Sequence, residues 1–250
     1  MIFRSAIALL VSLPALCAPS LSLEQVLARH YQARGGLTRI KALTSLRVTR
    51  KSVGGWVDST SVIEQKRPAS YRYDNDMQGA VFSQAYDGKS AWLLSPWNAK
   101  KRPEPMTPED TDQLAVQADL DGVLVDWKAK GHKVELADNE PVDGGDAYTL
   151  KVSLKNGDKI TIWLDLDSFL EIKRSHRRIV RGTEEEEETY SGEYAEVEGL
   201  FFPFFQEFGS KGSSRRSSVK VKKVELNPAI DDARFRMPVM KVDAAPPIAR

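Results

Sequence analysis

From Leu46 to Leu226, most of this chain alternates between apolar and polar residues along short segments. Such alternation sends successive side chains to opposite faces of a β-strand, so it predicts strands that bury one face. The clearest pair is 148–154 and 160–166, joined by Asn156-Gly157, a favoured two-residue hairpin turn. The sequence therefore predicts an extensive antiparallel sheet.

The predicted strands fall into two series separated by a helical segment. The first series lies near 44–54, 56–67, 69–75, 79–86 and 89–95, and the second begins at Tyr148. Between them, Thr107-Pro108-Glu109-Asp110 is typical of a helix start, with an N-cap, a proline in the first turn and early acids. A second helical piece is predicted from Gly122 to about Lys130, with Asp121 as its N-cap. We expect residues 108–130 to cover the sheet as a lid.

Other local patterns refine this prediction. Ser22 and Gln25 have capping-box spacing, so an amphipathic helix is expected from Leu23 to about Arg34, before Gly35-Gly36. The basic run 173–181 and the acidic run 184–188 are interpreted as facing arms of one hairpin, with opposite charges paired across the strands. In the aromatic run 200–208, Pro203 predicts an edge strand or a bulge, and a further bulge is predicted at Lys222-Lys223.

The first 20 residues have the features of a cleaved signal peptide. Arg4 precedes a short apolar run, and small and turn-forming residues follow it. Cys17 allows a lipid-anchored alternative, but Leu16 is bulky where a small residue is expected, so we expect Cys17 to be discarded with the signal. We therefore expect a periplasmic protein with a single domain over 21–240 and a disordered tail over 241–250.

Composition excludes several classes of function. Lys and Arg number 36 against 35 Asp and Glu, so the chain lacks the basic excess of nucleic-acid-binding proteins. Its three histidines are widely separated, and no metal-binding, phosphate-loop or nucleophile-elbow motif occurs. We therefore expect a monomeric non-enzymatic protein without a cofactor.

What remains is an apolar lining. Large apolar side chains on the predicted strands and on the connection between the two series are candidates to line a ligand cavity. They are Tyr71, Tyr73, Phe82, Trp92, Leu94, Trp127, Leu150, Ile162 and Leu164. For any single one of them a place in an ordinary hydrophobic core is the better explanation, whereas together they could line a cavity under a movable helical segment.

Several stretches resemble a known family. The hairpin 86–92, the segments 118–122 and 128–134 and the closing stretch 224–238 are similar to those of the LolA/LolB-like outer-membrane lipoprotein-sorting superfamily. The resemblance covers nearly the whole mature chain in element order. It implies an α+β fold, namely an open antiparallel β half-barrel, here of about ten strands, with helices packed on its concave side. It also implies periplasmic carriage of acyl chains in a hydrophobic cavity.

These observations favour a periplasmic binder or carrier of lipids or lipoproteins, with acyl chains as its partners. One alternative is an envelope stress sensor or scaffold that binds a membrane-protein partner through the same sheet. In that case the aromatic run 201–208 would be exposed. A lipid- or glycan-directed enzyme is a third alternative, which converging histidine and carboxylate groups in a pocket would support.

Overall fold

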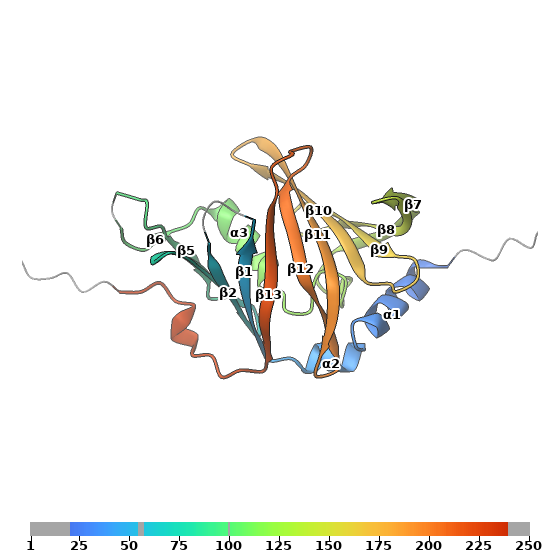
Figure 1. Cartoon of the computed structure of the whole chain (residues 1–250), viewed down its shortest axis with the longest axis horizontal. Helices are drawn as coiled ribbons and strands as arrows, with labels where there is room; N and C mark the ends of the chain where they lie inside the picture. Colours follow the sequence, from blue (N-terminus) through green and yellow to red (C-terminus); the bar gives the residue numbers. More distant parts are fainter. Residues whose placement is uncertain (1–20, 55–57, 100, 240–250) are drawn as a thin grey trace, which may run out of the picture.

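A computed structural model of the chain describes residues 21–54, 58–99 and 101–239. Its strands form one antiparallel sheet of 13 strands, ordered β6-β5-β4-β3-β2-β1-β13-β12-β11-β10-β9-β8-β7 (Figure 1). They are β1 (Ser45–Val53), β2 (Thr60–Lys66), β3 (Ser70–Met77), β4 (Ala80–Tyr86), β5 (Ala91–Leu94), β6 (Glu104–Pro105), β7 (Lys133–Val142), β8 (Gly145–Ser153), β9 (Lys159–Asp165), β10 (Glu171–Val180), β11 (Thr183–Val197), β12 (Leu200–Ser210) and β13 (Ser217–Leu226).

The strand count corrects the expectation of about ten. The sequence patterns did not indicate β6 or β7. β6 has only two residues, too few for any periodicity to be visible. β7 begins with a short alternation at Val134 and Leu136, but its pairing with β8 shifts register between Ala137 and Glu140, which interrupts the pattern.

The strand order explains why the two series of strands need a long connection. The chain starts at the middle of the sheet with β1, moves outward to the edge strand β6, and resumes at the opposite edge with β7 before returning to β13 beside β1. The residues between β6 and β7 must therefore pass from one edge of the sheet to the other (Figure 1). We call residues 108–130 the crossing segment.

Three α-helices accompany the sheet: α1 (Leu23–Ala33), α2 (Leu37–Ala42) and α3 (Pro108–Gln117). The predicted capping box of α1 is present, because Ser22 accepts from the Gln25 amide while the Gln25 side chain accepts from the Ser22 amide. Thr107 caps α3 with Pro108 in the first turn, also as predicted.

The predicted second helix over 122–130 is wrong. This part of the crossing segment is a run of turns, in which Gly122 and Asp126 have φ angles of 84° and 50°. Such left-handed backbone interrupts an α-helix. Asp121 is not a helix cap either, because its carboxylate is ion-paired with Arg67.

The helices and the crossing segment pack on one face of the curved sheet, the concave face. Over β8 and β9 this packing is dry: Leu150, Ile162 and Leu164 are 0% exposed. They meet residues of α1 and the crossing segment, namely Val26, Leu27, Val123 and Leu124. Each fully buried aliphatic side chain contributes about 1.5–3 kcal/mol, so this cluster is a major source of stability.

Over β3 to β5 the same face is covered by α3. Leu114 and Ala118 of the crossing segment pack on Tyr71 and Ala91. The opposite face of these strands is covered by the residues after β13, which include the 3-10 helix η1 (Asp232–Arg234). There the Trp92 indole donates to the Phe235 main-chain oxygen at 2.9 Å.

The two central strands β12 and β13 decide two further predictions. Pro203 lies within β12, which is not an edge strand. On one side it faces Tyr194 of β11, next to Glu193, whose φ angle is 50°. On the other side β13 pairs with β12 only from Phe205 onward. A missing amide is therefore tolerated there. The bulge at Lys222 is confirmed, because Thr49 and Arg50 face Lys223 and Val221.

The predicted charged hairpin is also confirmed. β10 and β11 pair so that Arg177 faces Glu186 and Arg178 faces Glu185. Arg178 and Glu185 form an ion pair at 3.2 Å. The predicted signal peptide (1–20) and the predicted tail (241–250) lie outside the described residues. Among the described helices, none is long and apolar enough to cross a membrane.

Candidate ligand-binding cavity

A cavity of about 430 Å³ lies between the crossing segment and the middle of the concave face. The ends of α1 and α2 close one side of it, and β10, β11 and β12 form its floor. Its volume falls in the range of about 300–1,000 Å³ that is usual for small-molecule sites.

The cavity has an apolar side and a polar side. The apolar side comes mainly from the helices, the crossing segment and β12: Ile40, Leu43, Val116, Leu120, Val123, Leu124, Leu200, Phe201 and Phe202. The polar side comes from alternate residues of β10 and β11, together with one residue of β12: Arg174, His176, Glu187, Thr189, Ser191 and Gln206. An amphiphile, with one apolar and one polar end, would match such a lining.

The end of α1 is held tightly against the floor. A side chain at Gly35 would have its Cβ 2.0 Å from the Gly199 main-chain oxygen, and Gly35 has φ +109°, so only glycine fits here. Two residues after Gly199, the Phe201 amide of β12 donates to the Arg34 main-chain oxygen at 3.1 Å. This close approach places the Arg34 side chain at the cavity.

Charged groups gather at this end of the cavity. Arg174 donates through Nε and Nη2 to both oxygens of Glu171, each at 2.8 Å. Burial alone raises the pKa of Glu171, but Arg174, His30 and Arg34 outweigh it and hold this pKa below its usual range. The Tyr194 hydroxyl donates to the Glu171 main-chain oxygen at 2.7 Å, and burial followed by the Glu171 charge raises the pKa of Tyr194. Glu171 is therefore an ionised acceptor at neutral pH.

His30 of α1 is 3% exposed beside this cluster. Its Nδ1 lies 2.8 Å from the Phe169 main-chain oxygen, so Nδ1 carries a proton and donates. Burial and then the nearby charge of Arg34 lower the pKa of His30 to about 4, so its ring is neutral at neutral pH.

The crossing segment is fastened over the cavity by polar contacts. Arg67 donates bidentately to Asp121 at 2.9 and 2.5 Å, and the Tyr31 hydroxyl donates to the Leu124 main-chain oxygen at 2.6 Å. Burial disfavours the Asp121 charge, but Arg67 outweighs burial and lowers the pKa of Asp121. Lys41 also pairs with Asp126 at 2.7 Å, and the Gln65 side chain donates to the Gln117 main-chain oxygen at 2.7 Å, so polar contacts hold the segment to both α2 and the sheet.

A second hollow, of about 450 Å³, lies between the start of α3 and the ends of the hairpins β8–β9 and β10–β11. Glu109, Asp110 and Asp112 line it from α3, and Arg177 and Arg178 line it from β10. Arg177 and Arg178 pair with the acids of β11 instead. No ion pair joins the two sides among the residues that the structure describes.

The predicted lining residues lie elsewhere. Leu150, Ile162 and Leu164 form the dry core under α1, with Trp127 packed at its margin, and Tyr71 and Tyr73 belong to the cluster under α3. The Phe82 ring lies 6.3 Å from that of Tyr73. Trp92 and Leu94 of β5 pair with Ala85 and Ser83 of β4, and they lie on the face opposite the helices. None of these residues lines the cavity, so ligand binding by them stays a prediction.

The lining that sequence reasoning missed consists of charged and polar residues. Arg34 precedes Gly35-Gly36 and has the pattern of an ordinary helix-terminal cation. Arg174 and His176 belong to the basic run 173–181, whose charges the sequence predicts to pair with the acidic run 184–188. The one signal available in the sequence was that Arg174 and His176 are two positions apart, a spacing that places both side chains on one face of a strand.

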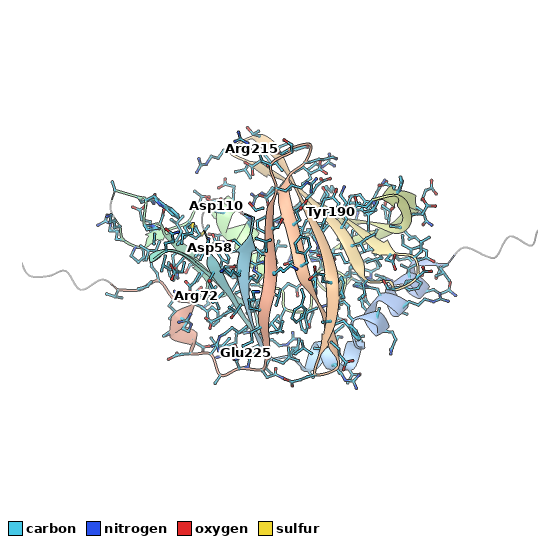
Figure 2. All side chains as sticks on the ribbon, viewed as in Figure 1. Asp58, Arg72, Asp110, Tyr190, Arg215 and Glu225 are labelled. Carbon is cyan, nitrogen blue, oxygen red and sulfur yellow. The ribbon has the colours of Figure 1, made fainter. Side chains whose placement is uncertain are left out.

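The opposite face of β10 and β11 carries a different charge network, beside Tyr190 (Figure 2). Glu188 pairs with Lys173 at 2.8 Å and with Arg216 at 2.9 Å, while Lys173 also lies over the rings of Trp163 and Tyr190 at 4.9 and 5.0 Å. These charges have partners, so they stabilise the sheet without requiring a ligand. No group of metal-binding side chains occurs in the described ranges.

The arrangement of the sheet and its helices is shared with solved structures. A LolA superfamily protein from Nitrosomonas europaea is 13% identical, over 87% of this chain and 98% of its own, with a TM-score of 0.57. A domain assigned to outer-membrane lipoprotein sorting from Vibrio parahaemolyticus is 14% identical, over 85% and 96%, with a TM-score of 0.52.

The chain has the LolA-like fold. A DUF1329 family protein from Desulfovibrio piger is also similar, at 10% identity over 87% and 98% of the two chains, with a TM-score of 0.55. No family model and no curated protein matches the sequence. At such identities the shared property is the LolA-like architecture: an open antiparallel sheet with helices on its concave side.

Proposed function

We propose that this protein is a non-enzymatic periplasmic binder or carrier of lipids or lipoproteins, with a part in outer-membrane lipoprotein sorting. The observation that carries the proposal is the cavity between the crossing segment and the concave face, apolar on one side and polar on the other. The LolA-like fold, shared with a domain assigned to lipoprotein sorting, supports it.

An acyl chain would lie against the apolar side. There Leu120, Val123 and Leu124 of the crossing segment approach Leu200 and Phe202 of β12. Burial of each methylene stabilises a complex by about 0.8 kcal/mol, so a chain of moderate length suffices for useful affinity. The head group would then face the polar residues of β10 and β11.

The crossing segment would act as the lid. Buried side chains and several polar contacts hold it to the sheet, and the bidentate pair of Arg67 and Asp121 is one of these contacts. Opening these contacts would expose the apolar side of the cavity for loading or release. Export by a cleaved signal over residues 1–20, with Cys17 discarded, belongs to the same proposal.

The test is binding of a fluorescent fatty acid by the purified mature chain, with mass spectrometry of co-purified lipids. Val116 lines the cavity from α3, so Val116→Trp should fill part of it and weaken binding about tenfold or more. Val53, which is 41% exposed and does not line the cavity, supplies the matched control Val53→Trp. Absence of both co-purified lipid and fatty-acid binding would contradict the proposal.

The scaffold alternative retains one supporting observation. Phe201 and Phe208 of the aromatic run are 36% and 37% exposed. If a protein partner binds there, Phe208→Ser should abolish its capture, whereas Val116→Trp should leave capture intact. This pair of variants separates the two functions.

A further inference from the structure

Arg34 differs from the other arginine and lysine side chains around the cavity in its polar partners. The other cations around the cavity each have a carboxylate partner: Arg67 with Asp121, Arg174 with Glu171, and Lys130 with Asp119. Within the described part of the chain, no carboxylate forms an ion pair with Arg34. Its side chain donates through Nη1 to the Asp121 main-chain oxygen at 3.0 Å, which is a neutral acceptor.

The guanidinium is nevertheless held in place. Arg34 caps the end of α1, its main-chain oxygen accepts from β12, and its Nη1 bonds to the crossing segment. Three parts of the fold therefore set its position. The carbonyl oxygens at the end of α1 offer a partial negative charge, but a helix end supplies only about half a unit charge and only over its last turn.

Arg34 also lies in a desolvated place. Its side chain is half-buried, and part of it remains open to the cavity. Burial lowers the pKa of Arg34, and the charge of Glu171 opposes this shift. Arginine keeps its proton in proteins, so a full positive charge stands at the cavity wall. A buried cation without a counterion is costly, and a bound anion would remove that cost.

The chemistry of the neighbouring groups narrows the ligand. A guanidinium presents a planar set of donors that matches a carboxylate or phosphate with paired hydrogen bonds. Glu171 and Tyr194, the nearest groups of the opposite character, are already bonded to Arg174 and to main chain. The hydroxyls of Thr189 and Ser191 line the same polar side and offer further donors.

We propose that Arg34 binds the anionic head group, a carboxylate or phosphate, of an amphiphile whose acyl chain occupies the apolar side of the cavity. This inference rests on the proposed function and adds the class of head group to it. A neutral amphiphile of the same length would leave Arg34 without a counterion and would bind less tightly.

The test compares dodecanoate with 1-dodecanol at pH 8, by displacement of a fluorescent fatty acid from the mature chain. The affinity of dodecanoate should be at least about tenfold higher than that of 1-dodecanol, because hydrogen bonds between two charged groups are stronger than those to a neutral hydroxyl. Arg34→Gln should lower the affinity for dodecanoate by about the same factor. It should change the affinity for 1-dodecanol by less than about twofold. Arg34→Lys keeps the charge without the planar donors, so the preference should shrink but persist.

The matched control is Arg29→Gln, an exposed arginine on the same helix that does not line the cavity. It should leave both affinities unchanged. Acetate tests the source of the anion: it should bind far more weakly than dodecanoate, because it has no chain to bury. If acetate bound as tightly as dodecanoate, the ligand would not need an acyl chain. The proposal of an amphiphile would then be wrong, and the site would be one for small anions. Thermal unfolding of each variant verifies that it is folded.

The outcomes separate the two proposals. Equal affinity of the wild-type chain for dodecanoate and 1-dodecanol overturns the role of Arg34 and leaves the carrier function intact. That role is also overturned if Arg34→Gln lowers the affinities for dodecanoate and 1-dodecanol by the same factor, or changes neither affinity. If the wild-type chain binds neither ligand, the carrier function fails and the head-group site fails with it.

Discussion

Two adjacent strands on the concave face carry opposite kinds of side chain. On β9, Ile160, Ile162 and Leu164 are at most 2% exposed beneath α1 and the crossing segment. Their direct cross-strand partners on β10 are His176, Arg174 and Glu171. The boundary between dry core and polar cavity therefore runs between two neighbouring strands, whose opposed side chains lie only about 5 Å apart.

The difference shows that the covering elements, not the sheet, decide where the cavity lies. These residues of the two strands lie opposite one another, although the pairing shifts register in β10 between Glu171 and Lys173. Over β9 the helices complete an apolar layer, whereas over β10 they stop short, so charged residues there face a space that water or a ligand can fill. The following variants test this contrast, from the largest expected effect to the smallest.

Removing volume from the dry side should have the largest effect. Ile162 is 0% exposed, so Ile162→Ala should lower the free energy of unfolding by about 4 kcal/mol through lost burial and a new cavity. Urea denaturation measures the change. A loss below about 1 kcal/mol would mean that β9 is not the dry side.

Acid should weaken the fold through His30. Its folded-state pKa of about 4 lies below the unfolded value of 6.5, so between these pH values the unfolded chain binds a proton that the folded chain does not. Stability from this group is therefore fully present above pH 6.5 and falls by about 3 kcal/mol as the pH drops to 4.

The measurement is the free energy of unfolding of the wild type and of His30→Gln across this pH range. Gln keeps a donor for Phe169 but does not titrate, so its curve should be flatter by about that amount. Parallel curves would show that His30 does not contribute to the acid sensitivity.

Breaking the pair on the polar side should have a smaller effect. Arg174→Gln leaves the Glu171 carboxylate without its bidentate partner, which should cost about 2 kcal/mol because the cavity still admits water. Adding Glu171→Gln should recover part of the loss, and a double-mutant cycle in urea gives the coupling. Purely additive effects would contradict a direct interaction.

The smallest effect is expected for a polar-to-apolar change at the cavity floor. Thr189→Val keeps the shape of the side chain and removes only a hydroxyl that faces the cavity, so stability should change by less than about 0.5 kcal/mol. Thermal unfolding provides the measurement. A loss of about 2 kcal/mol would mean that the hydroxyl makes a buried hydrogen bond rather than facing the cavity.

Much of the fold followed from local patterns. The turn at Asn156-Gly157, the capping box at Ser22 and the bulge at Lys222 depend on neighbouring residues, and each is present. The failed helix over 122–130 had apolar residues at suitable spacing. It was overridden by contacts with distant groups, in which Asp121 pairs with Arg67 and the Leu124 carbonyl accepts from Tyr31.

The candidate site was less predictable than the fold. Period-two alternation separates the two faces of a strand, but it does not say which face the helices cover. Trp92 was thus expected to line a cavity, whereas the structure places it under the residues after β13. Arg34 and Arg174 are 140 positions apart in the chain numbering and become neighbours of one carboxylate only through the packing of α1 on β12.

The sequence by itself determined the alternating strands, their tight turns and the helix caps, because these depend on backbone preferences and on residues a few positions apart. The cavity that the crossing segment leaves over β10 to β12 became visible only in the folded arrangement. So did the place of Arg34 beside it, where no carboxylate of the described ranges forms an ion pair with this side chain. The reason is physical: a cavity exists where covering elements fail to meet, and this depends on contacts between segments far apart in the chain.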